Sequence, residues 1–336
     1  MKFKHIIGAI DSHTAGEPTR IIIDGFPQVK GNTMTERVEY LREKMDWLRK
    51  SLMREPRGHR DMFGAILMPP IEPAADVAVI FMDGNRYYNM CGHASIGICA
   101  MMVETGRIDI TPMHTVVRLE TPIGIVEGTV TTKPDGEIEE VGLVGVPSFA
   151  SILNKKIEVP VQGEVMIDVG FGGNFFVMVD SAQLGFDKIL PKHMNELIKS
   201  GIAIRESANE QISVKHPTNE KINTIDFCMI TAPPSSPGTD ARNIVVIGKD
   251  QADRSPCGTG TCARMAVLHS KGQLPVNQTF RHESTIGSVF KGEIVAETFV
   301  GDLPAVIPKI SCRPFLTGFH QFVIDHDDPF GEGFII

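Results

Sequence analysis

The sequence predicts an α/β (α+β) protein of two similar halves, each with many short strands and one buried helix. Two observations support this prediction. Similar segments lie 166 positions apart, and 336 residues are enough for two hydrophobic cores. In each copy an apolar, β-rich run leads through six linking residues to Cys-Gly, and a glycine follows fifteen positions after the cysteine. This pattern indicates a strand, a loop and a helix that ends at glycine.

The two copies are aligned by their cysteines, Cys91 and Cys257. Their β-rich runs are residues 77–83 and 243–249, and their linking residues are 84–89 and 250–255. The helix after Cys91 is apolar almost all round, as expected if strands wrap it. Its apolar residues include Ile96, Ile98, Cys99, Met101, Met102 and Val103.

Other elements also occur twice. A glycine-containing turn leads into a β-branched or aromatic strand in residues 13–23 and again in 169–179. After the two central helices, residues 121–130 and 284–295 alternate as β-hairpins do. We therefore expect each half to repeat the same order of turn, strands, helix and hairpin.

Three segments are predicted outside the repeat. Residues 35–54 have apolar side chains at helical spacing and predict one surface helix. Residues 191–201 predict a shorter helix that begins at Pro191 and ends at Gly201. Residues 231–238, rich in proline and serine, predict a loop.

The domain boundary is expected within residues 145–165, after the first hairpin and before the second glycine turn. We assign residues 1–150 to the first half and 151–315 to the second. A C-terminal strand, at about 316–336, is expected to join the first half.

Composition excludes several classes of protein. A net charge of −8 argues against a nucleic-acid partner. No apolar run approaches the ~18 residues of a membrane span, so no membrane contact is expected. Asp11 interrupts the first apolar stretch, which is too short for a signal peptide. Six cysteines are too sparse for a disulfide framework, and we expect free thiols in the cytoplasm.

Cys-Gly at the start of a helix favours acid–base chemistry. A thiol there faces unpaired backbone N–H groups and the positive end of the helix dipole. Such a position lowers a cysteine pKa from about 8.5 toward roughly 3.5–7.5. Two such helix ends could also hold a carboxylate with their N–H groups. The remaining cysteines are interpreted as packing residues: Cys99, Cys228, Cys262 and Cys312.

Residues 90–93 (Met-Cys-Gly-His) and 253–261 (Asp-Arg-Ser-Pro-Cys-Gly-Thr-Gly-Thr) resemble the two signature segments of the proline racemase family. That family also includes 4-hydroxyproline 2-epimerases and trans-3-hydroxyproline dehydratases. Three further segments fit it, so the resemblance runs from end to end: residues 11–17, 55–59 and 318–325.

The resemblance implies the fold of diaminopimelate epimerase: two similar halves, each a strand barrel around a central helix, with the site in the cleft between them. It implies no pyridoxal phosphate, no other cofactor and no metal. One cysteine thiolate would remove the α-proton and the other thiol would protonate the opposite face. A small imino acid is the implied substrate, and a homodimer the expected assembly.

Site residues carry over by position. Gly92, His93, Gly258 and Thr259 would hold the substrate carboxylate, largely through backbone N–H groups. Asp253 would bind the ring ammonium, with His93 near the same nitrogen. The structural alternatives are a cap or salt-bridge role for Asp253 and a hydrogen-bonded core position for His93.

Two positions bear on the substrate. Phe63 matches an aromatic wall of the pocket, although core packing would also explain it. Proline racemases of the family tend to carry phenylalanine ten residues before the second cysteine, where this chain has Ile247. We expect a proline racemase, with a 4-hydroxyproline 2-epimerase as the alternative. A dehydratase is disfavoured because such enzymes have threonine at the position of Cys257, and a silent imino-acid-binding protein because binding needs neither cysteine.

Overall fold

The computed structural model of the chain describes residues 3–248 and 251–335. The chain forms two compact units, Met1–Leu143 with Arg313–Ile336 and Val144–Cys312, here called the first and the second unit. The predicted run 243–249 and linking segment 250–255 extend over residues 249 and 250, which lie outside the described residues.

The strands of the first unit form one continuous row. Neighbours pair antiparallel except β2 with β3 and β4 with β6, which are parallel, and the short β5 (Tyr87–Tyr88) pairs with β4. In order, the row is β18 (Pro314–Asp325), β1 (Phe3–Thr14), β2 (Glu17–Asp24), β3 (Phe63–Met68), β4 (Val77–Asp83), β6 (His114–Thr121), β7 (Gly124–Thr132) and β8 (Ile138–Val144).

The second unit repeats this row. Its parallel pairs, β11 with β12 and β13 with β15, stand at the same places, and β14 (Gln251–Ala252) pairs with β13 as β5 does with β4. A bridge between Ser148 and Val306 brings the two ends of the row together. In order, the row is β9 (Phe149–Val159), β10 (Gly163–Phe171), β11 (Phe175–Asp180), β12 (Ile225–Ala232), β13 (Ala241–Ile247), β15 (Thr279–Glu283), β16 (Val289–Val300) and β17 (Leu303–Cys312).

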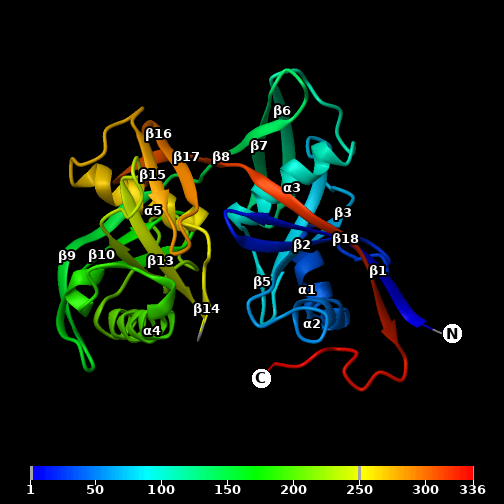
Figure 1. Ribbon diagram of the computed structural model, residues 1–336, viewed down its shortest axis with the longest axis horizontal. Helices are drawn as coiled ribbons and strands as arrows, with labels where there is room; N and C mark the ends of the chain where they lie inside the picture. Colours follow the sequence, from blue (N-terminus) through cyan, green and yellow to red (C-terminus); the bar gives the residue numbers. More distant parts are fainter. Residues whose placement is uncertain (1–2, 249–250, 336) are drawn as a thin grey trace. The chain divides into compact units, whose positions relative to one another are not determined.

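Each row surrounds one helix. In the first unit α3 (Gly92–Glu104) contacts β1, β7 and β18, and in the second α5 (Gly258–Ser270) contacts β9, β10 and β17 (Figure 1). Both helices end in the same way. Gly106 and Gly272 take positive φ, and the residue after each donates its N–H back to the last turn, from Arg107 to Met102 and from Gln273 to Leu268. The predicted pair of strand-wrapped helices is confirmed.

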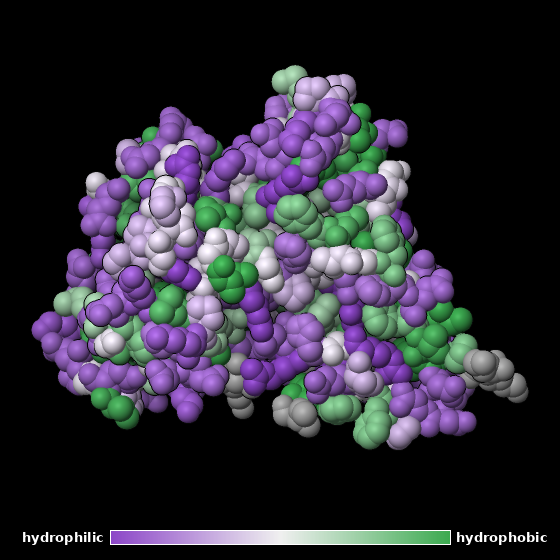
Figure 2. Space-filling view, viewed as in Figure 1, coloured by the Kyte–Doolittle hydropathy of each residue, from purple (hydrophilic) through white to green (hydrophobic). Residues whose placement is uncertain are grey.

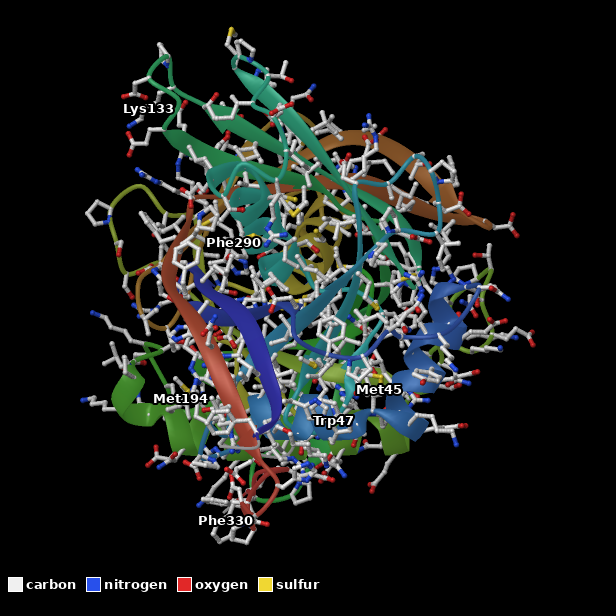
Figure 3. The ribbon with its side chains drawn as sticks, turned by 90° about the vertical axis from the view of Figure 1, so that its right-hand side faces the viewer. Met45, Trp47, Lys133, Met194, Phe290 and Phe330 are labelled. Atoms are coloured by element: carbon white, nitrogen blue, oxygen red, sulfur yellow. The ribbon has the colours of Figure 1, made fainter. Side chains whose placement is uncertain are left out.

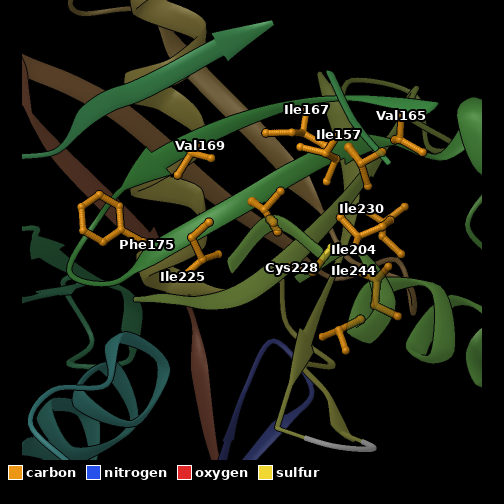
Figure 4. Packing of buried hydrophobic residues seen from close by; sticks show 14 of the residues in the cluster. Ile157, Val165, Ile167, Val169, Phe175, Ile204, Ile225, Cys228, Ile230 and Ile244 are labelled. Atoms are coloured by element: carbon orange, nitrogen blue, oxygen red, sulfur yellow. The ribbon is translucent and has the colours of Figure 1, made fainter. Parts of the chain in front are cut away.

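The central strands of the second unit are buried on both faces because a second helix covers them. Alternate residues such as Phe176, Met229 and Val245 pack with α5. The residues between them, such as Val177, Ile230 and Ile244, pack against α4 (Met194–Gln211), and Figure 4 shows part of this cluster. In the first unit, α1 (Met34–Lys44) and α2 (Asp46–Met53) cover the corresponding face of β1 to β4.

The predicted single helix at 35–54 is wrong in one respect, because it breaks at Met45. The backbone of Met45 (φ −137°, ψ 22°) ends α1, and Asp46 starts α2 with an ion pair to Arg49 at 2.7 Å. Figure 3 labels Met45 and Trp47 at this junction. The break lets Leu41 and Leu48, both fully buried, pack on the same core.

The predicted helix at 191–201 is also longer than expected. Pro191–His193 form a 3₁₀ turn, a second such turn is Ser181–Leu184, and α4 continues through Gly201 to Gln211. Gly201 does not end the helix but allows it to approach β13. A Cβ at this position would lie 2.5 Å from Val246 Cγ2. The glycine therefore serves close packing.

Polar residues cover most of the face seen in Figure 2, with apolar residues scattered among them. Among the residues that the structure describes, no helix is both long enough and apolar enough to cross a bilayer.

Replacing Gly201 with alanine tests this packing. In an exposed helix the change stabilises by about 1 kcal/mol. Here the new methyl group meets a stiff β-branched side chain, and we expect a loss of about 1–3 kcal/mol in the free energy of unfolding by urea. Val246→Ala should cost less in the Gly201→Ala background than in the wild type. A Gly201→Ala protein more stable than wild type would contradict this account.

Candidate active site

The segment before Cys91 is organised by a buried carboxylate, Asp83, at the end of β4. Asp83 Oδ1 accepts the N–H groups of Asn85 and Arg86 at 2.6 and 2.8 Å, and Oδ2 accepts the Tyr88 hydroxyl. Burial, and then the charge of Asp83, raises the pKa of the Tyr88 phenol, which stays a donor. This turn directs the chain to Cys91, the N-cap of α3, in an extended conformation (φ −149°, ψ 122°).

Cys91, His93 and Phe63 come together at this helix end. Cys91 Sγ lies 3.2 Å from His93 Nδ1, within hydrogen-bond reach, and an imidazolium at that position would stabilise a thiolate. Phe63 packs edge-on against the His93 ring at 4.9 Å between centroids. The His93 carbonyl accepts the Thr14 hydroxyl at 2.8 Å, which ties the β1–β2 turn to the first turn of α3.

Cys257 occupies the N-cap of α5 in a different conformation. Its φ of 66° is one that residues other than glycine rarely adopt. The thiol is almost fully buried, and Sγ lies 3.9 Å from Thr259 Oγ1. At Gly260 a Cβ would stand 3.1 Å from Cys257 Sγ, so a larger residue there would crowd the thiol.

Asp253 is linked to Cys257 through Ser255. Asp253 Oδ1 accepts both the N–H and the hydroxyl of Ser255, at 2.8 and 2.7 Å. Ser255 Oγ in turn accepts the Cys257 N–H at 3.1 Å. Asp253 is buried, and these bonds fix the direction of its carboxylate. The side chain of Asp253 therefore caps a turn in the loop before α5, and it does not cap the helix itself.

The remaining candidate substrate-binding residues lie in the same unit as Cys257. Gly258 and Thr259 are the first two residues of α5. Ile247, at the end of β13, is half-buried and packs on the cluster that contains Cys257, Phe176 and Met229. The structure thus groups Phe63, Cys91, Gly92 and His93 in the first unit, and Ile247, Asp253, Cys257, Gly258 and Thr259 in the second.

Sequence reasoning missed two residues of this region, Asp83 and Ser255. The signal for Ser255 was present, because Asp-x-Ser is typical of a turn in which the Asp side chain accepts from the backbone two residues on. Within the described residues, no three His, Cys, Asp or Glu side chains are grouped as metal ligands.

Three of the four cysteines that were predicted to be packing residues are buried. Cys99, Cys228 and Cys262 are buried, and burial raises the pKa of each, to about 12 for Cys228 and Cys262. Cys312, at the end of β17, is half-buried.

The family model, the curated relatives and the solved structures all match this chain to proline racemases and hydroxyproline epimerases. The family model described as proline racemase matches residues 9–335. A proline racemase from Clostridioides difficile is 47% identical over 336 residues, and the match covers all of both chains. A 4-hydroxyproline 2-epimerase from Streptosporangium roseum is 42% identical over 338 residues, again covering all of both chains. The crystal structure of a hydroxyproline epimerase from Agrobacterium vitis with bound trans-4-OH-L-proline is similar with a TM-score of 0.90 at 33% identity, covering 100% of this chain and 96% of that one.

Alkylation should separate the thiols. At pH 8 iodoacetamide should modify the half-exposed Cys91, while Cys99, Cys228 and Cys262 remain protonated and covered. Their labelling in native protein should be at least about 10³-fold slower than in urea, since only the unfolded fraction reacts. Peptide mass spectrometry measures each rate. Labelling of Cys262 as fast as that of Cys91 would contradict the packing of α5.

Proposed function

The chain belongs to the proline racemase family, and we propose that it racemises proline by passing the α-proton between Cys91 and Cys257. The family makes it an isomerase, a racemase or epimerase. The observation that carries the finer proposal is the matched position of the two thiols. Each is the N-cap of the strand-wrapped helix of its unit, although the two helices are far apart in sequence.

The reaction needs two groups for a geometric reason. One thiolate removes the α-proton, which leaves the C–H electron pair on the substrate, and the second thiol donates its proton to the opposite face. The first cysteine ends as a thiol and the second as a thiolate, so reversing the roles runs the reaction backward. A single base that returned its own proton from the same side would restore the starting enantiomer.

Backbone N–H groups are proposed to bind the substrate carboxylate. The first N–H bonds inside the helices are donated by Ser95 to Cys91 and by Thr261 to Cys257. The N–H groups of Gly92, His93, Gly258 and Thr259 precede these and have no acceptor within their helices. Donors held in place in this way also stabilise negative charge that develops next to the carboxylate when the α-proton leaves.

Asp253 is proposed to bind the ring ammonium. Its carboxylate is buried and fixed by Ser255, so it is oriented before the substrate arrives. His93 is proposed to lie near the same nitrogen, and its ring also lies 3.2 Å from the Cys91 thiol, where an imidazolium would favour the thiolate form of that cysteine.

The choice of substrate rests on Phe63 and Ile247. Phe63 supplies an aromatic face beside His93, which suits an apolar ring. Ile247 is smaller than phenylalanine and leaves room for a ring hydroxyl. The size of an apolar pocket alone changes the ratio of kcat/KM between the two substrates by only about 10²-fold, whereas a dedicated hydrogen-bond partner for the hydroxyl can change it by about 10⁴-fold or more. The side chain of Ile247 offers no such partner, and we therefore place proline first.

The second candidate is 4-hydroxyproline 2-epimerisation by the same two thiols. Ile247 favours it, and so does the likeness to the two hydroxyproline enzymes from Streptosporangium roseum and Agrobacterium vitis. A dehydratase is disfavoured by the cysteine at position 257, and a binding protein by the presence of both thiols.

Replacing either thiol should separate catalysis from folding. Cys91→Ser and Cys257→Ser should each lower racemisation of L-proline by roughly 10²–10⁴-fold, because a serine hydroxyl is too weak an acid to serve as the resting base. In deuterium oxide the wild type should place deuterium in the D-proline formed before it appears in the remaining L-proline, as NMR can follow. Cys312→Ser, at a half-buried cysteine outside the site, is the control. Full activity in either active-site variant would overturn the two-thiol mechanism.

The substrate is tested at position 247. We expect a larger kcat/KM for L-proline than for trans-4-hydroxy-L-proline, and we expect Ile247→Phe to lower the hydroxyproline value more than the proline value. Ile247→Leu, which conserves volume, should change the ratio little. A wild-type kcat/KM for hydroxyproline well above that for proline would assign the chain to the epimerases instead.

A further inference from the structure

The peptide bond that joins Pro256 to Cys257 is held by side chains at both of its polar groups. Ser255 Oγ accepts its N–H at 3.1 Å. Its carbonyl accepts two bonds, from Asn243 Nδ2 at 2.8 Å and from Thr261 Oγ1 at 3.2 Å. A peptide fixed in this way sets the direction in which the Cys257 side chain leaves the backbone.

The bonds of Thr261 have a direction that chemistry fixes. A carbonyl only accepts, so the single hydroxyl proton of Thr261 goes to Pro256. Thr261 Oγ1 then accepts from His282 Nδ1, which lies 2.9 Å away. Burial, and then the charge of Arg264, lowers the pKa of His282 to about 3. The ring is neutral with its proton on Nδ1, and a chain of donors runs from His282 through Thr261 to Pro256.

This network is not what packing alone would select. Among the described residues, neither Asn243 Oδ1 nor His282 Nε2 has a hydrogen-bond partner, although both atoms are buried. Apolar side chains of similar shape would avoid that desolvation cost. At the places that correspond to Asn243 and His282 the first unit has apolar residues. Val77 of β4 pairs with Leu119 of β6 as Ala241 of β13 pairs with His282 of β15, so Leu119 corresponds to His282. Two residues further along β4, Val79 corresponds to Asn243.

The conformations of the two cysteines account for this difference. Cys91 is extended, with a φ of −149°, a conformation that any residue adopts readily. Cys257 has a φ of 66°, which is strained for any residue with a side chain. A strained residue keeps its conformation only where its surroundings over-determine it.

We propose that Asn243, Thr261 and His282 are positioning residues that hold the Pro256–Cys257 peptide and thereby aim the Cys257 thiol at the substrate. This inference rests on the proposed function for the identity of the substrate. The orientation of the thiol is a property of the second unit, because all residues involved belong to it.

Thr261→Val tests the proposal, since it keeps the shape of the side chain and removes the hydroxyl. We expect kcat to fall by about 10²-fold, the scale of an ångström-level misplacement, with little change in KM. Thr261→Ser, which keeps the hydroxyl, should recover most of the activity. Thr115→Val is the matched control, because the buried hydroxyl of Thr115 also makes two hydrogen bonds but lies in the first unit. It should leave kcat unchanged.

A second measurement needs no substrate. In Thr261→Val, and in His282→Leu should the first variant fold poorly, iodoacetamide should label Cys257 severalfold faster while labelling of Cys91 stays the same. Thr261→Ser as inactive as Thr261→Val, or Cys257 labelling equal to that of the wild type, would overturn the proposal. A wild type that does not racemise proline, combined with faster labelling of Cys257 in Thr261→Val, would refute the proposed function and support the positioning role.

Discussion

A helix enclosed by strands still has to find acceptors for its first N–H groups, and this requirement governs both units. Strands pack along the sides of α3 and α5. At the far end a glycine turns the chain back onto the last carbonyls, and at the near end lie the N–H groups that we propose to bind the substrate carboxylate. The second layer of helices follows from the same arrangement, because strands that pack inward on a helix expose their other face unless something covers it.

The sequence was informative wherever a local signal marks an element. The repeated Cys-Gly and its glycine fifteen residues later locate both central helices, and alternation locates the hairpins. The sequence-based prediction of helices was wrong at Met45, because the helical spacing of apolar residues continues across the break between α1 and α2. It was also wrong at Gly201, because this glycine allows close packing and does not end the helix. The positive φ of Cys257 and the bonds among Asn243, Thr261 and His282 could not be predicted, because they join residues that only the fold brings together.

The two units have the same order of strands, but the surroundings of their cysteines differ. Cys91 has an extended backbone and lies beside the His93 imidazole, which in turn packs against Phe63. Cys257 lies in strained backbone that Ser255, Asn243 and Thr261 hold in place. The two units therefore place the thiol at the same end of the helix but surround it with different groups. Two thiols proposed to act as acid and base in one reaction can therefore have different neighbours.

The first unit is assembled from both ends of the chain, since β18 pairs with β1 across almost the whole sequence, while the second unit is one uninterrupted stretch. This has a consequence during synthesis on the ribosome, where domains generally fold as units when they become complete. All residues of the second unit, 144–312, have been made before β18 is synthesised. The earlier-made strands of the first unit must wait with the edge of β1 unpaired until the last part of the chain arrives. Synthesis of the first unit therefore begins before that of the second unit but ends after it.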